Sequence, residues 1–281
     1  NIYRFFGRKV CAFVLRFVVL YFFVTGRERR EFSRDFLRTV LKRQPSSKEM
    51  YNHFYNFSLC ILDTIAAWNG DMASDAIRVS SLDNINQMVE EKKGALIIVS
   101  HLGNPDISRA TLDKKMRDRV VLLLHTRNAI HYNQALKKIH PDATSNMMQI
   151  TDIGPETILD LQQRVDEGAF ITIAGDRTPF SSEGHISYVD FFDRLAPFAH
   201  GPWIIASLLG CPVYLLFCTA DERQCYTLSI ERFIDQVDLP RRNREELLNH
   251  YCQLYAKRLE IYAAKTPFQW FNFFDFWARL K

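Results

Sequence analysis

The stretch ALIIVSHLGNPDISRA, residues 95–110, passes from an unbroken apolar run directly into polar residues. A short continuous run of this kind, rich in β-branched residues, is typical of a strand buried on both faces. His101 follows the run, Gly103 permits a tight turn, and Pro105 suits the first turn of a helix. The stretch therefore predicts a buried strand that delivers a histidine, and Asp106 five residues later, to its carboxyl end.

Three further runs resemble this one and alternate with helical segments. We predict the strands at residues 94–100, 119–126, 168–176 and 211–219, and the helices near residues 106–117, 155–167, 200–210 and 242–265. Strands that alternate with helices indicate an α/β fold in which a central, mostly parallel sheet is flanked by helices. Ligands of such sheets bind beyond the carboxyl ends of the strands, so GDRTP at 175–179 is expected to share a crevice with His101.

The region before the first of these strands has a different sequence pattern. Residues 27–92 read as mainly helical, with a break at Pro45, Ser46 and Ser47 and no strong strand signal. We therefore predict two regions: residues 1–92, which are helical and associate with a membrane, and residues 93–281, which form an α/β catalytic domain.

The basic charge of the chain is concentrated at its N-terminus. The net charge is +4, but residues 1–43 contain eleven Lys and Arg against three acidic residues, a net charge of +8. They surround an apolar stretch at 10–24 that is shorter than the roughly 20 residues of a spanning helix and is interrupted by Arg16. One interpretation is a helix that lies in a membrane surface with its cations on anionic headgroups. The other is an amphipathic core helix with a solvated basic flank.

Composition argues against several other classes of protein. The six cysteines have no disulfide or zinc-finger spacing, which favours a reducing, cytoplasm-facing environment. His125, His131 and His140 form no i, i+4 pair, so we predict no metal site. The excess of basic residues is confined to a hydrophobic segment, and the sequence contains no known nucleic-acid-binding motif. We therefore expect no nucleic-acid partner.

The pair His101 and Asp106 has a chemical interpretation. A neutral imidazole can take a proton from an attacking hydroxyl, while a carboxylate on the other ring nitrogen fixes the tautomer and stabilises the imidazolium. A histidine and an aspartate at this spacing also occur by chance, and a structural histidine stays open as the alternative.

Four ordered blocks of the chain resemble the late lipid A acyltransferase family of the lysophospholipid acyltransferase superfamily. They are HLGNPD at 101–106, LHTRNAIHYNQAL at 124–136, GDRTP at 175–179 with FFDRLAPFAHGPWIIA at 191–206, and TPFQWFNFF at 266–274. The similarity covers roughly residues 94–275, and the basic hydrophobic N-terminus is also similar to that family.

The resemblance implies transfer of a fatty acyl group from a thioester of acyl-carrier protein or coenzyme A to a hydroxyl of an amphipathic lipid. It implies no metal or redox cofactor and a location on the cytoplasmic face of the inner membrane, peripheral or held by one N-terminal anchor. His101 would be the general base and Asp106 its orienting partner, and backbone N–H groups of residues 101–104 are candidate oxyanion donors. The predicted substrate-binding residues are Gly103, Asn104, Arg127, Asn128, Asp176 and Arg177.

The departures from the family pattern concern the acceptor. Pro105, Arg177 and Asp193 replace the Trp, Gln and Gly that are frequent in the family, and Phe273 and Phe274 stand where basic residues would suit a phosphorylated headgroup. We therefore expect an acceptor other than standard lipid A. A thioesterase or N-acyltransferase with the same two residues, and a non-catalytic lipid or carrier-binding protein, are the alternatives.

Overall fold

A seven-stranded sheet forms the centre of the protein. The computed structural model describes residues 2–91, 93–124, 137, 141–144, 146–149, 154–178 and 185–278. The order across the sheet is β1 (Ile77–Val79), β9 (Tyr226–Ile234), β8 (Val213–Ala220), β2 (Ala95–Val99), β5 (Phe170–Ala174), β3 (Val120–Leu124) and β4 (Met147–Gln149). Neighbours from β8 to β4 pair in parallel, whereas β9 runs antiparallel to β8. The predicted α/β class with a mostly parallel sheet is confirmed.

The side chains of the central strands point alternately to the two faces of the sheet, and this divides the core into two layers. All five residues of β2 are buried, and its alternate side chains contribute to two separate apolar clusters. Leu96 and Ile98 pack with α8 (Pro155–Asp166), α9 (Gly201–Leu209) and α10 (Arg244–Lys265). Ile97 and Val99 pack with α4 (Leu82–Glu90), α5 (Pro105–Ala110) and α6 (Lys114–Asp118). A strand buried on both faces needs apolar residues at every position, which explains the unbroken run that the sequence shows.

The structure corrects the predicted elements in two places. The helix expected near residues 106–117 is two short helices, α5 and α6, separated by a turn. The strands β1, β4, β6, β7 and β9 were not predicted, because they are short or carry partly exposed, polar-interrupted patterns. Since β1 pairs with β9, the sheet includes residues from the predicted N-terminal region. The division at residue 92 stays a prediction.

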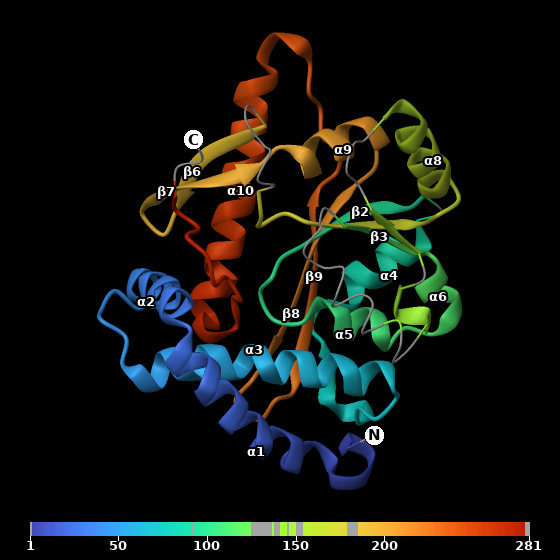
Figure 1. Ribbon diagram of the computed structural model, residues 1–281. Helices are drawn as coiled ribbons and strands as arrows, with labels where there is room; N and C mark the ends of the chain where they lie inside the picture. The colour runs from blue at the N-terminus through green and yellow to red at the C-terminus, as the bar shows by residue number, and fades with distance from the viewer. Residues whose placement is uncertain are drawn as a thin grey trace.

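Three N-terminal helices lie across one end of the sheet (Figure 1): α1 (Ile2–Thr25), α2 (Arg27–Leu41) and α3 (Ser47–Trp68). The predicted break at Pro45 to Ser47 is there, and a capping box of Ser46 and Glu49 starts α3. Helix α1 lies along α3. Arg8 of α1 donates through Nε and Nη2 to the buried carboxylate of Asp63 in α3, at 2.7 and 2.8 Å. Tyr226 of β9 donates to the same carboxylate, so this bond network fixes α1 to the body of the protein.

The outer surface of α1 is apolar. Its large exposed hydrophobic residues are Phe5, Phe6, Val10, Phe13, Val14, Phe17, Val18, Leu20, Tyr21, Phe22 and Val24. In the described part of the chain, no single helix has the length and hydropathy to cross a membrane. The pair Phe5–Thr25 and Arg27–Leu41, bent by 95°, meets both criteria when taken together.

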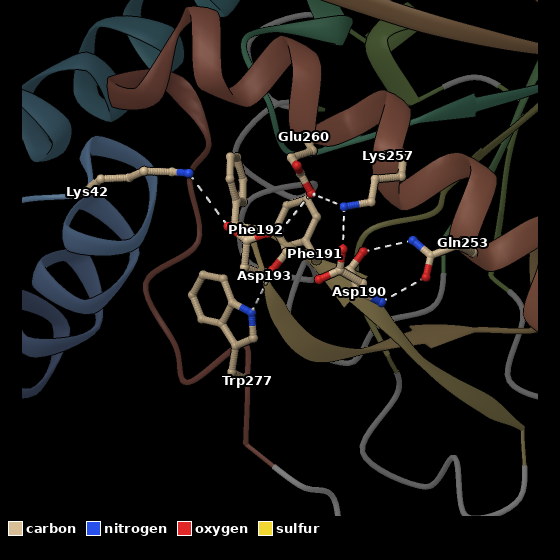
Figure 2. A network of polar contacts seen from close by, with 9 residues as sticks. All are labelled: Lys42, Asp190, Phe191, Phe192, Asp193, Gln253, Lys257, Glu260 and Trp277. Atoms are coloured by element: carbon tan, nitrogen blue, oxygen red, sulfur yellow. Dashed lines mark hydrogen bonds and ion pairs between the residues drawn. The ribbon is translucent and has the colours of Figure 1, made fainter.

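A separate hairpin packs against α10. It consists of β6 (Ile186–Phe191) and β7 (Arg194–Ala199), joined by Phe192 and Asp193. Both turn residues have positive φ, 54° and 60°, as a two-residue loop that matches the strand twist requires. Helix α10 holds this turn (Figure 2): the amide of Phe192 donates to Glu260 at 2.7 Å, and Gln253 exchanges two hydrogen bonds with the backbone of Asp190.

The turn contains conformational strain that a single substitution removes. Asp193 is exposed, and its ion pair with Lys42, 3.6 Å long between two exposed side chains, contributes little stability. Because glycine has no Cβ to clash at positive φ, we expect Asp193→Gly to raise the free energy of unfolding by about 0.5–1 kcal/mol. Denaturant unfolding measures this, with Lys42→Ala as the control for the lost ion pair. A variant that is less stable than the wild type would contradict the strain argument.

Candidate active site

The turn after β2 is fixed by backbone contacts on both sides. Leu102 forms an antiparallel bridge with Trp270, and Gly103 forms a parallel bridge with Cys218 of β8. Gly103 has a φ of +69°, and a Cβ at this position would lie 2.0 Å from the carbonyl oxygen of Cys218. Glycine is therefore required for the close approach of the two chains. The turn holds the His101 backbone in one place, directly beyond the carboxyl end of β2.

His101 is oriented by Asp176, which follows the carboxyl end of the neighbouring strand β5. The Nδ1 atom of His101 lies 2.8 Å from Oδ1 of Asp176, and the His101 amide donates to Oδ2 at 2.8 Å. The parallel pairing of β2 with β5 places the two loops side by side. His101 and Asp176, which the sequence expects to be neighbours, are thus in direct contact, and the crevice expected between their loops stays a prediction.

The orienting partner predicted for His101 is corrected by this contact. Asp106 lies in the first turn of α5, and its Oδ1 accepts a hydrogen bond from Nη2 of Arg109 at 3.3 Å. The imidazole Nδ1 is bonded to Asp176 instead. The spacing of five residues does not bring Asp106 to this nitrogen because the helix that begins at Pro105 carries the carboxylate along its own first turn.

Asp176 is a buried carboxylate with three N–H donors. Besides the two groups of His101, the indole Nε1 of Trp270 donates to Oδ2 at 2.8 Å. Burial raises the pKa of Asp176, but the charge and hydrogen bond of His101, the charge of Arg177 and the indole bond outweigh it, and the pKa ends below its ordinary value. The carboxylate is therefore ionised at neutral pH and can stabilise a positive charge on the imidazole.

The other imidazole nitrogen is available. Among the described residues, Nε2 of His101 has no hydrogen-bond partner, and the side chain is 36% exposed. If Nδ1 carries the proton that it donates to Asp176, Nε2 presents a lone pair to the outside. This arrangement is that of a general base, because one nitrogen is held by a buried carboxylate and the other is open to a reactant.

Asn104 has a structural role. Its side chain is buried, its Nδ2 donates to the carbonyl oxygen of Cys60 at 2.9 Å, and its Oδ1 accepts from Thr64 at 3.0 Å. Both partners lie in α3. The substrate contact predicted for Asn104 is therefore replaced by a tie between the turn and α3, because both polar atoms of the amide already have protein partners.

The oxyanion donors predicted in the turn are engaged elsewhere. The amide of His101 donates to Asp176, that of Leu102 to the Ser100 hydroxyl at 3.3 Å, that of Gly103 to Gln269 at 2.8 Å and that of Asn104 to Cys218 at 2.7 Å. No N–H group of residues 101–104 is left for a substrate oxygen. This expectation was wrong, because these donors build the turn itself.

Arg177 lies beside the pair and is exposed. Its Nη2 donates to the carbonyl oxygen of Phe271 at 3.2 Å, and its guanidinium lies 5.5 Å from the ring centroid of Phe274. This bond engages one of the five N–H groups of a guanidinium. Arg127 and Asn128, the other predicted substrate-binding residues, lie outside the residues that the structure describes.

Trp270 was missed by the sequence analysis. Its side chain is fully buried, and three rings pack against the indole, with centroids 4.8 Å (Phe36), 5.2 Å (Phe191) and 4.8 Å (Phe276) away. Its carbonyl oxygen binds Nε2 of His53 in α3, at 2.9 Å. The only signal was the resemblance of TPFQWFNFF to the fourth family block, which gave no role for the indole.

His53 connects Trp270 to the N-terminal helices. It is fully buried, and its Nδ1 lies 2.9 Å from the hydroxyl of Ser33 in α2. Burial lowers the pKa of His53 to about 4, although the bond to the Trp270 carbonyl opposes this. The imidazole is therefore neutral at physiological pH, with Nε2–H donating to the carbonyl and Nδ1 accepting from the serine.

This neutral histidine makes stability depend on pH. Between an unfolded pKa of about 6.5 and the folded pKa of about 4, the unfolded chain binds a proton that the folded chain does not. The free energy of unfolding must therefore fall as the pH falls through this range, by at most about 3 kcal/mol.

We expect His53→Gln, which can still donate to the carbonyl but does not titrate, to flatten this slope. Denaturant unfolding between pH 7 and 4 measures it; Asp176 is present in both proteins, so its contribution cancels in the difference between their slopes. An unchanged slope in the variant would show that His53 is not responsible.

One comparison with known proteins assigns a family to the chain. The family model of the bacterial lipid A biosynthesis acyltransferase matches residues 1–279. No curated protein matches the sequence. The match extends over nearly the whole chain and includes the N-terminal helices, the His101 turn and the C-terminal segment that holds Trp270. The chain belongs to the bacterial lipid A biosynthesis acyltransferase family.

Proposed function

We propose that the protein transfers a fatty acyl group from a thioester of acyl-carrier protein or coenzyme A to a hydroxyl group of a lipid-like acceptor. One observation carries the proposal: the Nδ1 atom of His101 is held by the buried carboxylate of Asp176, while Nε2 is open. Family membership gives acyl transfer of the lipid A type as the reaction class. The geometry supports His101 as the base of the proposed proton transfer and Asp176 as the carboxylate that orients it.

The reaction needs one base, which takes a proton in the first step and gives it to the leaving group in the second. Nε2 of His101 takes the proton of the acceptor hydroxyl while the oxygen attacks the thioester carbonyl carbon, and the carbonyl electron pair moves onto oxygen. The tetrahedral intermediate collapses with cleavage of the C–S bond, and the imidazolium gives its proton to the departing thiolate. The products are an ester and a free thiol. Asp176 stabilises the imidazolium that exists between the two steps, and no metal or redox cofactor takes part.

We assign Asp106 a supporting role in this scheme. Its carboxylate lies in the first turn of α5, where the helix dipole favours negative charge, and it pairs with the largely buried Arg109. Through this helix it stabilises the turn that ends at Pro105. Arg177, Arg127 and Asn128 remain the residues that we propose for binding the substrates.

The N-terminal helices support delivery of the acceptor from a membrane surface. Helix α3 contacts both α1 and the His101 turn, through Asn104. The apolar outer face of α1 is therefore separated from the turn by one helix. We propose that this face rests in the cytoplasmic surface of the inner membrane, with arginines of α1 and α2 at the headgroups.

The acceptor that we propose is not standard lipid A. The aromatic residues Phe273 and Phe274 occupy the segment next to Arg177, and the Phe274 ring lies against its guanidinium. A diphosphorylated sugar headgroup is best bound by several cations. A segment with two phenylalanines favours an acceptor whose polar part carries less charge.

Replacement of the proposed base tests the function. We expect His101→Ala to abolish one acylated product in the source cells, since no other group replaces Nε2. Mass spectrometry of lipid extracts should show its precursor, lighter by one acyl chain. His250→Gln, a histidine on the exposed side of α10, is the control and should keep the product. Unchanged lipid profiles with folded, expressed His101→Ala would favour a non-catalytic binding protein, and release of free fatty acid without an acylated lipid would favour a thioesterase.

Matched substitutions distinguish the roles of the two carboxylates. We expect Asp176→Asn to lower kcat by about 10²–10⁴-fold, because the amide stabilises neither the tautomer nor the imidazolium. Asp106→Asn should lower it by less than about tenfold, since its bond is to Arg109. Initial rates of thiol release from an acyl thioester measure both. A larger loss for Asp106→Asn than for Asp176→Asn would reverse the assignment.

A further inference from the structure

Asn272 is a buried residue whose polar side chain has no partner among the residues that the structure describes. It is 3% exposed, and neither Oδ1 nor Nδ2 has a hydrogen-bond partner among the described residues. An unsatisfied buried amide lowers the stability of a folded protein, and buried polar groups are nearly always paired. The partner of such a residue is a bound water or a group of a ligand.

The position of Asn272 favours a ligand. The preceding residue, Phe271, donates its N–H to the carbonyl oxygen of His101 at 2.9 Å and accepts from Arg177 through its own carbonyl oxygen. The N–H of Asn272 itself donates to the carbonyl of Trp270 at 2.8 Å. Asn272 thus belongs to the backbone segment that runs along the His101 turn and beside Arg177.

The reaction needs a donor that the turn does not supply. Thioester aminolysis and alcoholysis both place negative charge on the carbonyl oxygen, and an enzyme stabilises it with N–H groups in a dry site. All four N–H groups of residues 101–104 are engaged by the protein. Among the described residues, no acceptor engages the two N–H bonds of the Asn272 amide, and the side chain is buried.

We propose that Asn272 is a catalytic residue that binds the thioester carbonyl oxygen through Nδ2 and stabilises the oxyanion formed there. The inference rests on the proposed acyl transfer. The contact strengthens as the carbonyl oxygen gains charge, so it favours the transition state over the bound substrate. No covalent bond to Asn272 forms or breaks. Arg177, which donates to the carbonyl oxygen of Phe271, adds positive charge beside the same segment.

Asn272→Leu is the decisive variant, because leucine has a similar size and no polar atoms. If the amide serves the substrate alone, its loss removes an unsatisfied buried group, and the thermal unfolding midpoint stays equal or rises by a few degrees. The matched control is Asn104→Leu. Asn104 is buried to the same degree, but both of its amide atoms have partners, so this variant should unfold at a lower temperature.

Activity is measured on the full chain with acyl-coenzyme A and with acyl-carrier protein thioester, by initial thiol release and by mass spectrometry of the cellular lipids. With the donor that supports wild-type turnover, we expect Asn272→Leu to lower kcat about 10²–10³-fold and to leave KM within a few-fold. The acylated lipid should disappear from the cells as it does with His101→Ala.

Two results would overturn the proposal. Wild-type kcat in Asn272→Leu would show that the amide does not contact the reacting oxygen, and a lower unfolding midpoint like that of Asn104→Leu would show that it is needed for structure. His101→Ala distinguishes failure of the proposed function from failure of the role assigned to Asn272. If His101→Ala keeps the acylated lipid, the proposed function itself fails; if it loses the lipid while Asn272→Leu keeps it, only the assignment of Asn272 fails.

Discussion

The carboxylate of Asp176 is the group on which the rest of the site depends. It is buried and accepts three N–H bonds, from the backbone and imidazole of His101 and from the indole of Trp270. Burying a charge is costly unless hydrogen bonds and a countercharge replace the lost water. Two residues supply these bonds, His101 from the loop after β2 and Trp270 from the C-terminal segment, so both must be in place together with the loop that carries Asp176.

Trp270 connects Asp176 to distant parts of the chain. Its indole is packed between rings from α2, from the β6–β7 hairpin and from the C-terminal segment. Its carbonyl binds the neutral His53 of α3. The N-terminal helices, which carry the apolar face of α1, therefore help to support His101 and Asp176. This arrangement connects the apolar face of α1 with the carboxylate that orients the imidazole.

Sequence reasoning succeeded where a pattern is local. The unbroken runs of β2, β5 and β8 predicted buried parallel strands, and the order of four weak motifs predicted the family that the match over residues 1–279 shows. It failed for β9, whose residues are partly exposed and whose apolar positions are interrupted. It also joined α5 and α6 into one helix, because element ends depend on tertiary contacts that no local pattern records.

The sequence by itself determined the class of fold, the position of His101 at the end of a buried strand, and the position of residues 175–178 at the end of another, because each follows from residue type and periodicity. Only the tertiary structure decided that Asp176 rather than Asp106 holds His101, that Asn104 ties the turn to α3, and that the turn's own N–H groups are engaged. The physical reason is that a hydrogen bond depends on distance in space. Asp176 lies 75 residues from His101 along the chain and 2.8 Å from it in the fold.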